Sequence, residues 1–122
     1  MVGKEVKTVL VVDDEQDVRD SVQRVLELNG YRVLTAIDGD DCLQKIQQER
    51  PDLILLDIMM PGTPVKTIVS QIANIKIAYM SVVRISDARK QGLCVQPNVV
   101  DFIQKPFDTN ELINRVELLL KG

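Results

Sequence analysis

The hydrophobic pattern of the chain alternates between short unbroken aliphatic runs and longer segments in which apolar residues recur every three or four positions. The unbroken runs are typical of strands buried on both faces, and they predict strands at 8–12, 31–36, 53–56, 75–80 and 99–103. The periodic segments predict amphipathic helices at 17–29, 40–49 and 65–73. A fourth helix should begin at an N-cap, Ser86, and end near Gly92. A fifth should follow the Asp108–Glu111 capping box and reach Leu120. Five strand-then-helix units predict an α/β fold, with a parallel sheet covered by helices on both faces.

The aliphatic run 53–56 leads directly into a carboxylate, Asp57. An ionised aspartate inside the sheet would need a partner, because burying an unpaired charge costs on the order of several kcal/mol. At the carboxyl end of the strand it would instead lie at the edge where open α/β sheets carry their binding crevice. Asp57 is therefore the first candidate for a functional group.

Composition narrows the class of protein. The length of 122 residues suits one domain spanning 1–122, of which we expect the first few residues to be loose. A hydrophobic fraction of 45% and a charged fraction of 27% are typical of a globular chain, and the net charge of -3 argues against a broad nucleic-acid surface. No apolar run is long enough to span a bilayer and no signal core opens the chain, so we expect a cytoplasmic location and no membrane partner.

Two residue types limit the chemistry. Cys42 and Cys94 form no C-x-x-C motif, and we expect both to be free and to behave as small hydrophobes. The chain has no histidine, which excludes His-based catalysis and His metal ligands. Any reaction must therefore use carboxylates, lysine, hydroxyls or an oxygen-ligated cation.

Polar residues follow four of the predicted strands. Asp13 and Asp14 follow the first, Asp57 the third, Ser81 the fourth, and Lys105 comes just after the fifth. Because parallel strands end on one edge, these groups should meet there. Three neighbouring carboxylates repel unless a cation joins them, and all-oxygen ligation suits Mg²⁺ or Mn²⁺. Such a site can take a phosphoryl group, with Asp57 as nucleophile and Ser81 and Lys105 on phosphoryl oxygens.

Each of these residues also has a simpler interpretation. An aspartate after a strand is often a helix N-cap, and acidic residues favour helix N-termini through the dipole. Lys105 alone is typical of a solvated side chain, while Phe102 and Phe107 are typical of a core. The functional interpretation rests on the joint occurrence of these groups at the ends of different strands.

Four motifs carry a resemblance to a known family. They are Val11-Val12-Asp13-Asp14-Glu15, Leu55-Leu56-Asp57-Ile58-Met59-Met60-Pro61-Gly62, Ser81 after an aliphatic strand, and Lys105-Pro106-Phe107. Together they resemble the receiver domain of two-component response regulators, over nearly the whole chain and in the same order.

The resemblance implies a flavodoxin-like (βα)5 domain with strand order 2-1-3-4-5. It implies that Asp57 accepts a phosphoryl group from a histidine kinase or a phosphotransfer protein. It also implies a Mg²⁺ held by Asp13, Asp14, Asp57 and the backbone carbonyl of Met59. The phosphodonor would be another protein or a small acyl phosphate.

The resemblance also assigns a switch. Ser81 and Lys105 would contact the phosphoryl group, and Phe102 would turn inward when Ser81 is drawn to it. The fourth helix, fifth strand and fifth helix would form the output face, for a downstream protein or an output domain outside this chain. The Lys105–Pro106 bond would be a cis peptide.

The chain departs from the family pattern at several positions. Gly62-Thr63-Pro64-Val65-Lys66 replaces the usual Asp-Gly, and Gln96-Pro97-Asn98 replaces the usual turn before the fifth strand. Val82 stands where a small residue is usual, and we expect it to narrow access to Asp57. Met59 and Val83 cannot readily orient an attacking water, so we expect a long-lived phosphoryl state.

Three hypotheses follow. The first is a phosphorylatable signalling switch, which is a binding module and not a turnover enzyme. The second is a degenerate receiver that docks partners independently of phosphorylation, supported by Val82 and the altered loop. The third, a Mg²⁺-dependent phosphohydrolase, would need a second acid two residues after Asp57, where the chain has Met59.

Overall fold

The computed structural model describes residues 5–121, so the expectation of loose first residues concerns positions 1–4 and lies outside the described residues. The strands are β1 (Thr8–Val12), β2 (Arg32–Ala36), β3 (Leu53–Leu56), β4 (Lys76–Ser81) and β5 (Val99–Gln104). The helices are α1 (Gln16–Leu28), α2 (Gly39–Gln48), α3 (Val65–Ser70), α4 (Ile85–Lys90) and α5 (Thr109–Leu120). The strands pair in parallel in the order β2-β1-β3-β4-β5, which confirms the predicted fold class.

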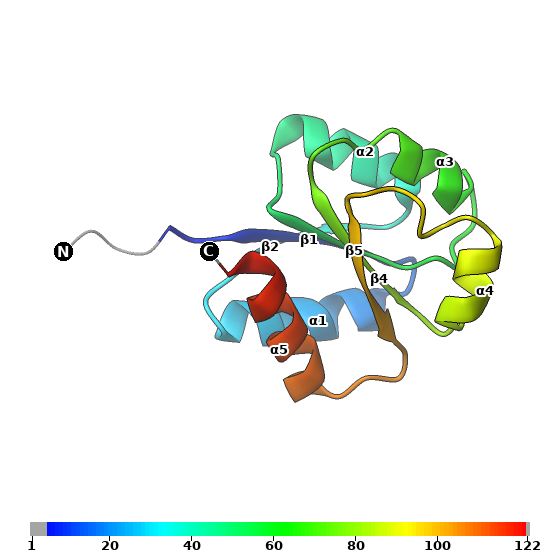
Figure 1. The fold of residues 1–122 in the computed structure, drawn as a ribbon. Coiled ribbons are helices and arrows are strands. Elements are labelled where there is room, and N and C mark those ends of the chain that lie inside the picture. Colours follow the sequence, from blue (N-terminus) through cyan, green and yellow to red (C-terminus); the bar gives the residue numbers. More distant parts are fainter. Residues whose placement is uncertain (1–4, 122) are drawn as a thin grey trace.

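The sheet separates two layers of helices (Figure 1). Alternate strand residues such as Leu10 and Ile54 pack toward α2, α3 and α4, and the residues between them, such as Val11 and Leu55, pack toward α1 and α5. Every residue of β1 and β3 is buried. The unbroken aliphatic runs in the sequence therefore reflect strands that are covered on both faces.

The third helix is shorter than the prediction of 65–73, because α3 ends at Ser70. The chain then turns through Asn74, which has a φ of 63°. The side-chain amide of Asn98 donates to the carbonyl oxygens of Ile72 at 3.1 Å and Ile75 at 2.9 Å. These carbonyls are satisfied by a residue from the loop before β5, so the helix does not need to continue.

The predicted N-cap of the fourth helix was wrong, whereas that of the fifth is confirmed. Arg84 is the extended cap residue of α4, and Ser86 lies inside the first turn. The helix starts before Ser86 because the N–H groups of Asp87 and Ala88 both donate to the carbonyl oxygen of Arg84, at 3.0 Å each. In α5 the Asp108 carboxylate accepts from the N–H of Glu111 at 2.7 Å.

Three smaller expectations also have an outcome. Cys42 and Cys94 are both free in the described part of the chain, and burial raises the pKa of the Cys42 thiol to about 12. The Lys105–Pro106 peptide bond is cis. Among residues 5–121, no helix has both the length and the apolar character that crossing a membrane requires.

Candidate functional site

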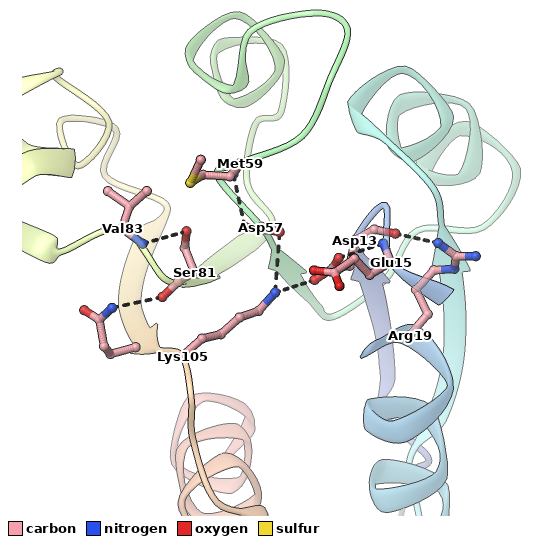
Figure 2. A network of polar contacts seen from close by, with 9 residues as sticks. Asp13, Glu15, Arg19, Asp57, Met59, Ser81, Val83 and Lys105 are labelled. Carbon is pink, nitrogen blue, oxygen red and sulfur yellow. Dashed lines mark hydrogen bonds and ion pairs between the residues drawn. The ribbon is translucent and has the colours of Figure 1, made fainter. Parts of the chain in front are cut away.

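The carboxyl edge of the sheet brings the predicted residues together. The backbone ladder extends one residue past β1 and β3, since the N–H of Asp13 donates to Ala36 O at 3.2 Å and that of Asp57 to Val12 O at 3.0 Å. Both aspartates are therefore held rigidly where their strands end. Figure 2 shows Asp57 between Asp13 on one side and Ser81 on the other.

Three carboxylates form an acidic cluster at this edge. Asp13, Asp14 and Asp57 each offer an oxygen atom, and these atoms lie within 4.8 Å of one another. Asp13 is fully buried and Asp57 is 5% exposed, whereas Asp14 is open to solvent. Hard oxygen donors at this spacing, with one side open to water, match the preferences of Mg²⁺ and Mn²⁺.

Lys105 supplies a positive charge to two of these carboxylates. Its Nζ lies 2.7 Å from Asp13 Oδ2 and 3.4 Å from Asp57 Oδ2. Figure 2 shows Lys105 reaching toward both carboxylates. Burial disfavours the charged amine, but the hydrogen bond to Asp13 and the charges of both carboxylates outweigh it and raise the pKa of Lys105. Lys105 therefore stays protonated while it lies between the two acids.

The Asp57 carboxyl has a raised pKa. Burial is the main cause, and the nearby charge of Asp13 adds to it. The N–H of Met59, which donates to Asp57 Oδ1 at 3.0 Å, and the ammonium of Lys105 act in the opposite direction. These two donors stabilise the ionised carboxylate that a nucleophile requires.

Asp13 is positioned by two contacts from α1 and the turn before it. Its Oδ1 accepts from the N–H of Glu15 at 3.0 Å, and its carbonyl oxygen accepts from Arg19 Nη1 at 2.8 Å (Figure 2). Sequence reasoning missed Arg19. The only signal in the sequence was its position in the first turns of the helix after Asp13, which is shared by many solvated residues.

The other side of Asp57 is formed by the end of β4. Ser81 is fully buried, and its Oγ accepts from the N–H of Val83. The carbonyl oxygen of Ser81 accepts from the backbone N–H of Lys105 at 2.8 Å and from Gln104 Nε2 at 3.2 Å. Ser81 thus lies at the site edge, and no sequence signal had pointed to Gln104.

Phe102 lies in the core on the α4 side of the sheet. Its ring packs edge-on against Tyr79, with 6.1 Å between the ring centroids. The Tyr79 hydroxyl donates to Leu93 O at 2.6 Å, and burial raises the pKa of this phenol. The core interpretation of Phe102 is confirmed, while its role as a switch stays a prediction. Phe107 is partly buried against the α1 and α5 layer.

Met59 and Val82, which depart from the family pattern, are close in sequence to Asp57 and Ser81, whereas Gln96-Pro97-Asn98 precedes β5 at the other end of the sheet. Val82 is 60% exposed and lines a groove of about 410 Å³ with Val18, Phe107 and the stem of Lys105. Met59 is 58% exposed beside Asp57. In the altered loop, Thr63 Oγ1 lies 3.0 Å from both carboxylate oxygens of Asp40, which ties the loop to the start of α2.

The fold and the acidic site define a class of protein, and comparison with known proteins agrees with it. Residues 9–117 match the family model of the response regulator receiver domain, and the chain belongs to this family. It is 40% identical to the transcriptional regulatory protein PrrA of Mycobacterium tuberculosis over 93% of this chain and 49% of that protein. The chain thus spans about half the length of that relative.

Two solved structures share the fold, and their sequence identities to this chain are close to one another. The chemotaxis response regulator CheY4 of Vibrio cholerae superposes with a TM-score of 0.83 and is 29% identical, over 95% of this chain and 100% of that one. The response regulator TrrA of Thermotoga maritima, solved in complex with Mg(2+)-BeF, has a TM-score of 0.80 and is 30% identical, over 94% of this chain and 100% of that one.

Proposed function

We propose that this receiver domain is the phosphoacceptor switch of a two-component system, and that Asp57 is the residue phosphorylated. The observation that carries the proposal is the arrangement of Asp57 with Asp13, Asp14 and Lys105 at one edge of the sheet. A nucleophilic carboxylate, a cation site and a fixed ammonium are the groups that phosphoryl transfer to an aspartate requires.

In the proposed reaction an oxygen of Asp57 attacks the phosphorus of the donor. The donor is the phosphohistidine of a histidine kinase or phosphotransfer protein, or a small acyl phosphate. The new P–O bond forms as the bond from phosphorus to the donor nitrogen or oxygen breaks, and the leaving group keeps that electron pair. The product is an aspartyl phosphate, whose oxygens Lys105 and Ser81 would hold by hydrogen bonds.

We propose Mg²⁺, or Mn²⁺ in its place, as the cofactor. The residues that would hold it are Asp13, Asp14, Asp57 and the backbone carbonyl of Met59. When bound, the cation neutralises negative charge on the acidic cluster and on the phosphoryl group. Support comes from the hard-oxygen donor set and from TrrA, which was solved in complex with Mg(2+)-BeF.

We further propose that Ser81 and Phe102 transmit the state of Asp57 to the face formed by α4, β5 and α5. The partner on that face is a downstream protein, or an output domain in a longer protein of the kind that PrrA represents. The chain acts as a binding module with phosphoryl chemistry directed at itself, and not as a turnover enzyme. Its expected location in the cytoplasm stays a prediction.

A mass measurement tests the proposal. Incubation with acetyl phosphate and Mg²⁺ should add the mass of one phosphoryl group, and Asp57→Asn should abolish the addition. Asp20→Asn, on the exposed face of α1, is the matched control and should be labelled as the wild type is. An unchanged mass of folded wild-type protein would instead favour the phosphorylation-independent docking module.

The lifetime of the label is a separate prediction. Met59 and Val83 flank the site without a polar group that could orient an attacking water. We expect slow loss of the phosphoryl group, and we expect Met59→Asn to shorten the lifetime by about tenfold, which is the rate equivalent of one added hydrogen bond. The measurement is the decay of labelled protein in Mg²⁺ buffer after the donor is removed. Fast decay of wild-type label would contradict this expectation.

A further inference from the structure

We propose that Gln104 is a positioning residue for phosphoryl transfer, which holds Ser81, at the end of β4, and the loop that follows it against the end of β5. This inference rests on the proposed function, since it concerns the groups that would contact the phosphoryl group. Gln104 is the last residue of β5 and pairs in register with Ser81, the last residue of β4.

Two hydrogen bonds from one side chain carry the proposal. Gln104 Nε2 donates to the carbonyl oxygen of Val82 at 2.9 Å and to that of Ser81 at 3.2 Å. The amide therefore contacts both the last residue of β4 and the first residue of the loop that follows it. The backbone N–H of Lys105 is the second donor on the Ser81 carbonyl, at 2.8 Å.

The loop also has an internal contact that depends on this arrangement. The N–H of Val83 donates to Ser81 Oγ, so the hydroxyl that would contact the phosphoryl group is oriented by the residue two positions later. Figure 2 shows this contact directly beside Asp57. If the Val82 carbonyl moves, the peptide that leads to Val83 moves with it and the orientation of the Ser81 hydroxyl changes.

The position of Gln104 separates this role from simple packing. Its side chain is exposed, and its stem fills no part of the core. Phe102, two residues earlier on the same face of β5, is buried against Tyr79. The amide thus links the loop to the strand that bears the proposed switch aromatic, and the adjacent residue of that strand is Lys105.

The loop position should affect both phosphorylation of Asp57 and hydrolysis of the aspartyl phosphate. Transfer to Asp57 and hydrolysis of the aspartyl phosphate each need a hydrogen bond from Ser81 in the transition state. Removing the amide should therefore slow both steps by a similar factor, which is at most the roughly tenfold loss expected when one neutral hydrogen bond is removed. A change in water access at Met59 would alter only the hydrolysis.

The test compares three substitutions of Gln104 in the whole chain. Gln104→Leu removes the hydrogen-bond donors. Gln104→Glu keeps the size of the side chain but places a carboxylate against two carbonyl oxygens. Gln104→Lys supplies an ammonium that can donate to the same carbonyl oxygens. The rates of labelling by acetyl phosphate with Mg²⁺ and of label loss are measured for each. Gln47→Leu and Gln47→Glu, on the exposed face of α2, are the matched controls.

A spectroscopic measurement on unphosphorylated protein reports the loop itself. The Val83 amide resonance and its hydrogen exchange should change in the Leu and Glu variants and stay close to wild type in the Lys variant. Slowing of both rates in the Leu and Glu variants, with recovery in the Lys variant, is the expected result.

Other outcomes overturn the proposal in distinguishable ways. Wild-type rates in Gln104→Leu, with normal labelling of the wild type, would overturn this inference and leave the proposed function intact. Slowing in Gln104→Glu alone would assign the effect to charge, and slowing in all three variants would assign it to the glutamine stem. Absence of label on the wild-type protein would overturn the proposed function, and this inference with it.

Discussion

The two sides of Asp57 are built from different interactions. On the β1 side, Asp13 and Asp14 complete the acidic cluster with Asp57. Lys105, in a largely buried position, bridges Asp13 and Asp57 by ion pairs. On the β4 side, Ser81 and the loop after it are held by neutral hydrogen bonds from Val83 and Gln104.

This difference suggests that the β1 side serves phosphoryl transfer and that the β4 side serves the conformational switch. Breaking a buried ion pair leaves an uncompensated charge and costs about 3–5 kcal/mol, whereas a neutral hydrogen bond contributes about 0.5–1.5 kcal/mol net. The β1 side is therefore the rigid side, where charge is fixed before a phosphoryl group arrives. The β4 side can exchange its contacts at small cost, which suits a switch.

The largest effect is expected when the ion pairs on the charged side are removed. Lys105→Met keeps the length of the stem but removes the ammonium between Asp13 and Asp57, so the two carboxylates lose the positive charge that pairs with both of them. We expect labelling by acetyl phosphate to slow by about a hundredfold, as for loss of one electrostatic donor in a transition state. Lys90→Met, on an exposed position of α4, is the control and should label normally. A normal rate in Lys105→Met would mean that the two sides do not differ as described.

A smaller effect is expected on the neutral side. Ser81→Ala removes the hydroxyl and with it the acceptor for the Val83 N–H. Because a single hydrogen bond of ordinary strength is lost, labelling should slow by about tenfold. Ser86→Ala, which changes an exposed hydroxyl in the first turn of α4, should have no effect on the rate. An effect of Ser81→Ala as large as that of Lys105→Met would contradict the comparison.

Behind the neutral side, Tyr79 anchors the segment after α4. Tyr79→Phe removes the donor to Leu93 O and leaves that buried carbonyl unsatisfied. We expect the free energy of unfolding to fall by about 1–2 kcal/mol in urea denaturation, with little change in the rate of labelling. The same substitution at Tyr31, which lies at the opposite edge of the sheet, should change stability less. A large loss of labelling in Tyr79→Phe would place this residue in the chemistry.

The smallest expected effect concerns pH. Burial raises the pKa of Asp57 in the folded protein, so its ionisation destabilises the fold as pH rises above the unfolded value of about 3.9. Asp57→Asn should therefore be more stable than wild type at neutral pH without divalent cation, by less than the change expected for Tyr79→Phe. The difference in stability should vanish below about pH 3.9, where Asp57 is neutral in both the folded and the unfolded protein. Urea denaturation across pH would show this, and an advantage that persists in acid would point to a cause other than ionisation.

The sequence by itself determined the fold and most of the site. Strands buried on both faces require unbroken aliphatic runs, so carboxylates such as Asp13 and Asp57 had to lie where those runs end. The order of strands and helices then placed these ends on one edge of a parallel sheet. The cap of α5 at Asp108 was equally local, because its partner Glu111 is three residues away.

Only the tertiary structure decided the contacts that join distant parts of the chain. Lys105 lies closer to Asp13 than to Asp57, although 92 residues separate it from Asp13. Gln104 reaches the carbonyl oxygens of Ser81 and Val82, at the end of β4. Asn98 satisfies the carbonyl oxygens of Ile72 and Ile75, which follow the early end of α3. These contacts depend on the register of β4 with β5 and on the paths of the loops through space. No local periodicity or spacing encodes those quantities, so no sequence pattern could have predicted them.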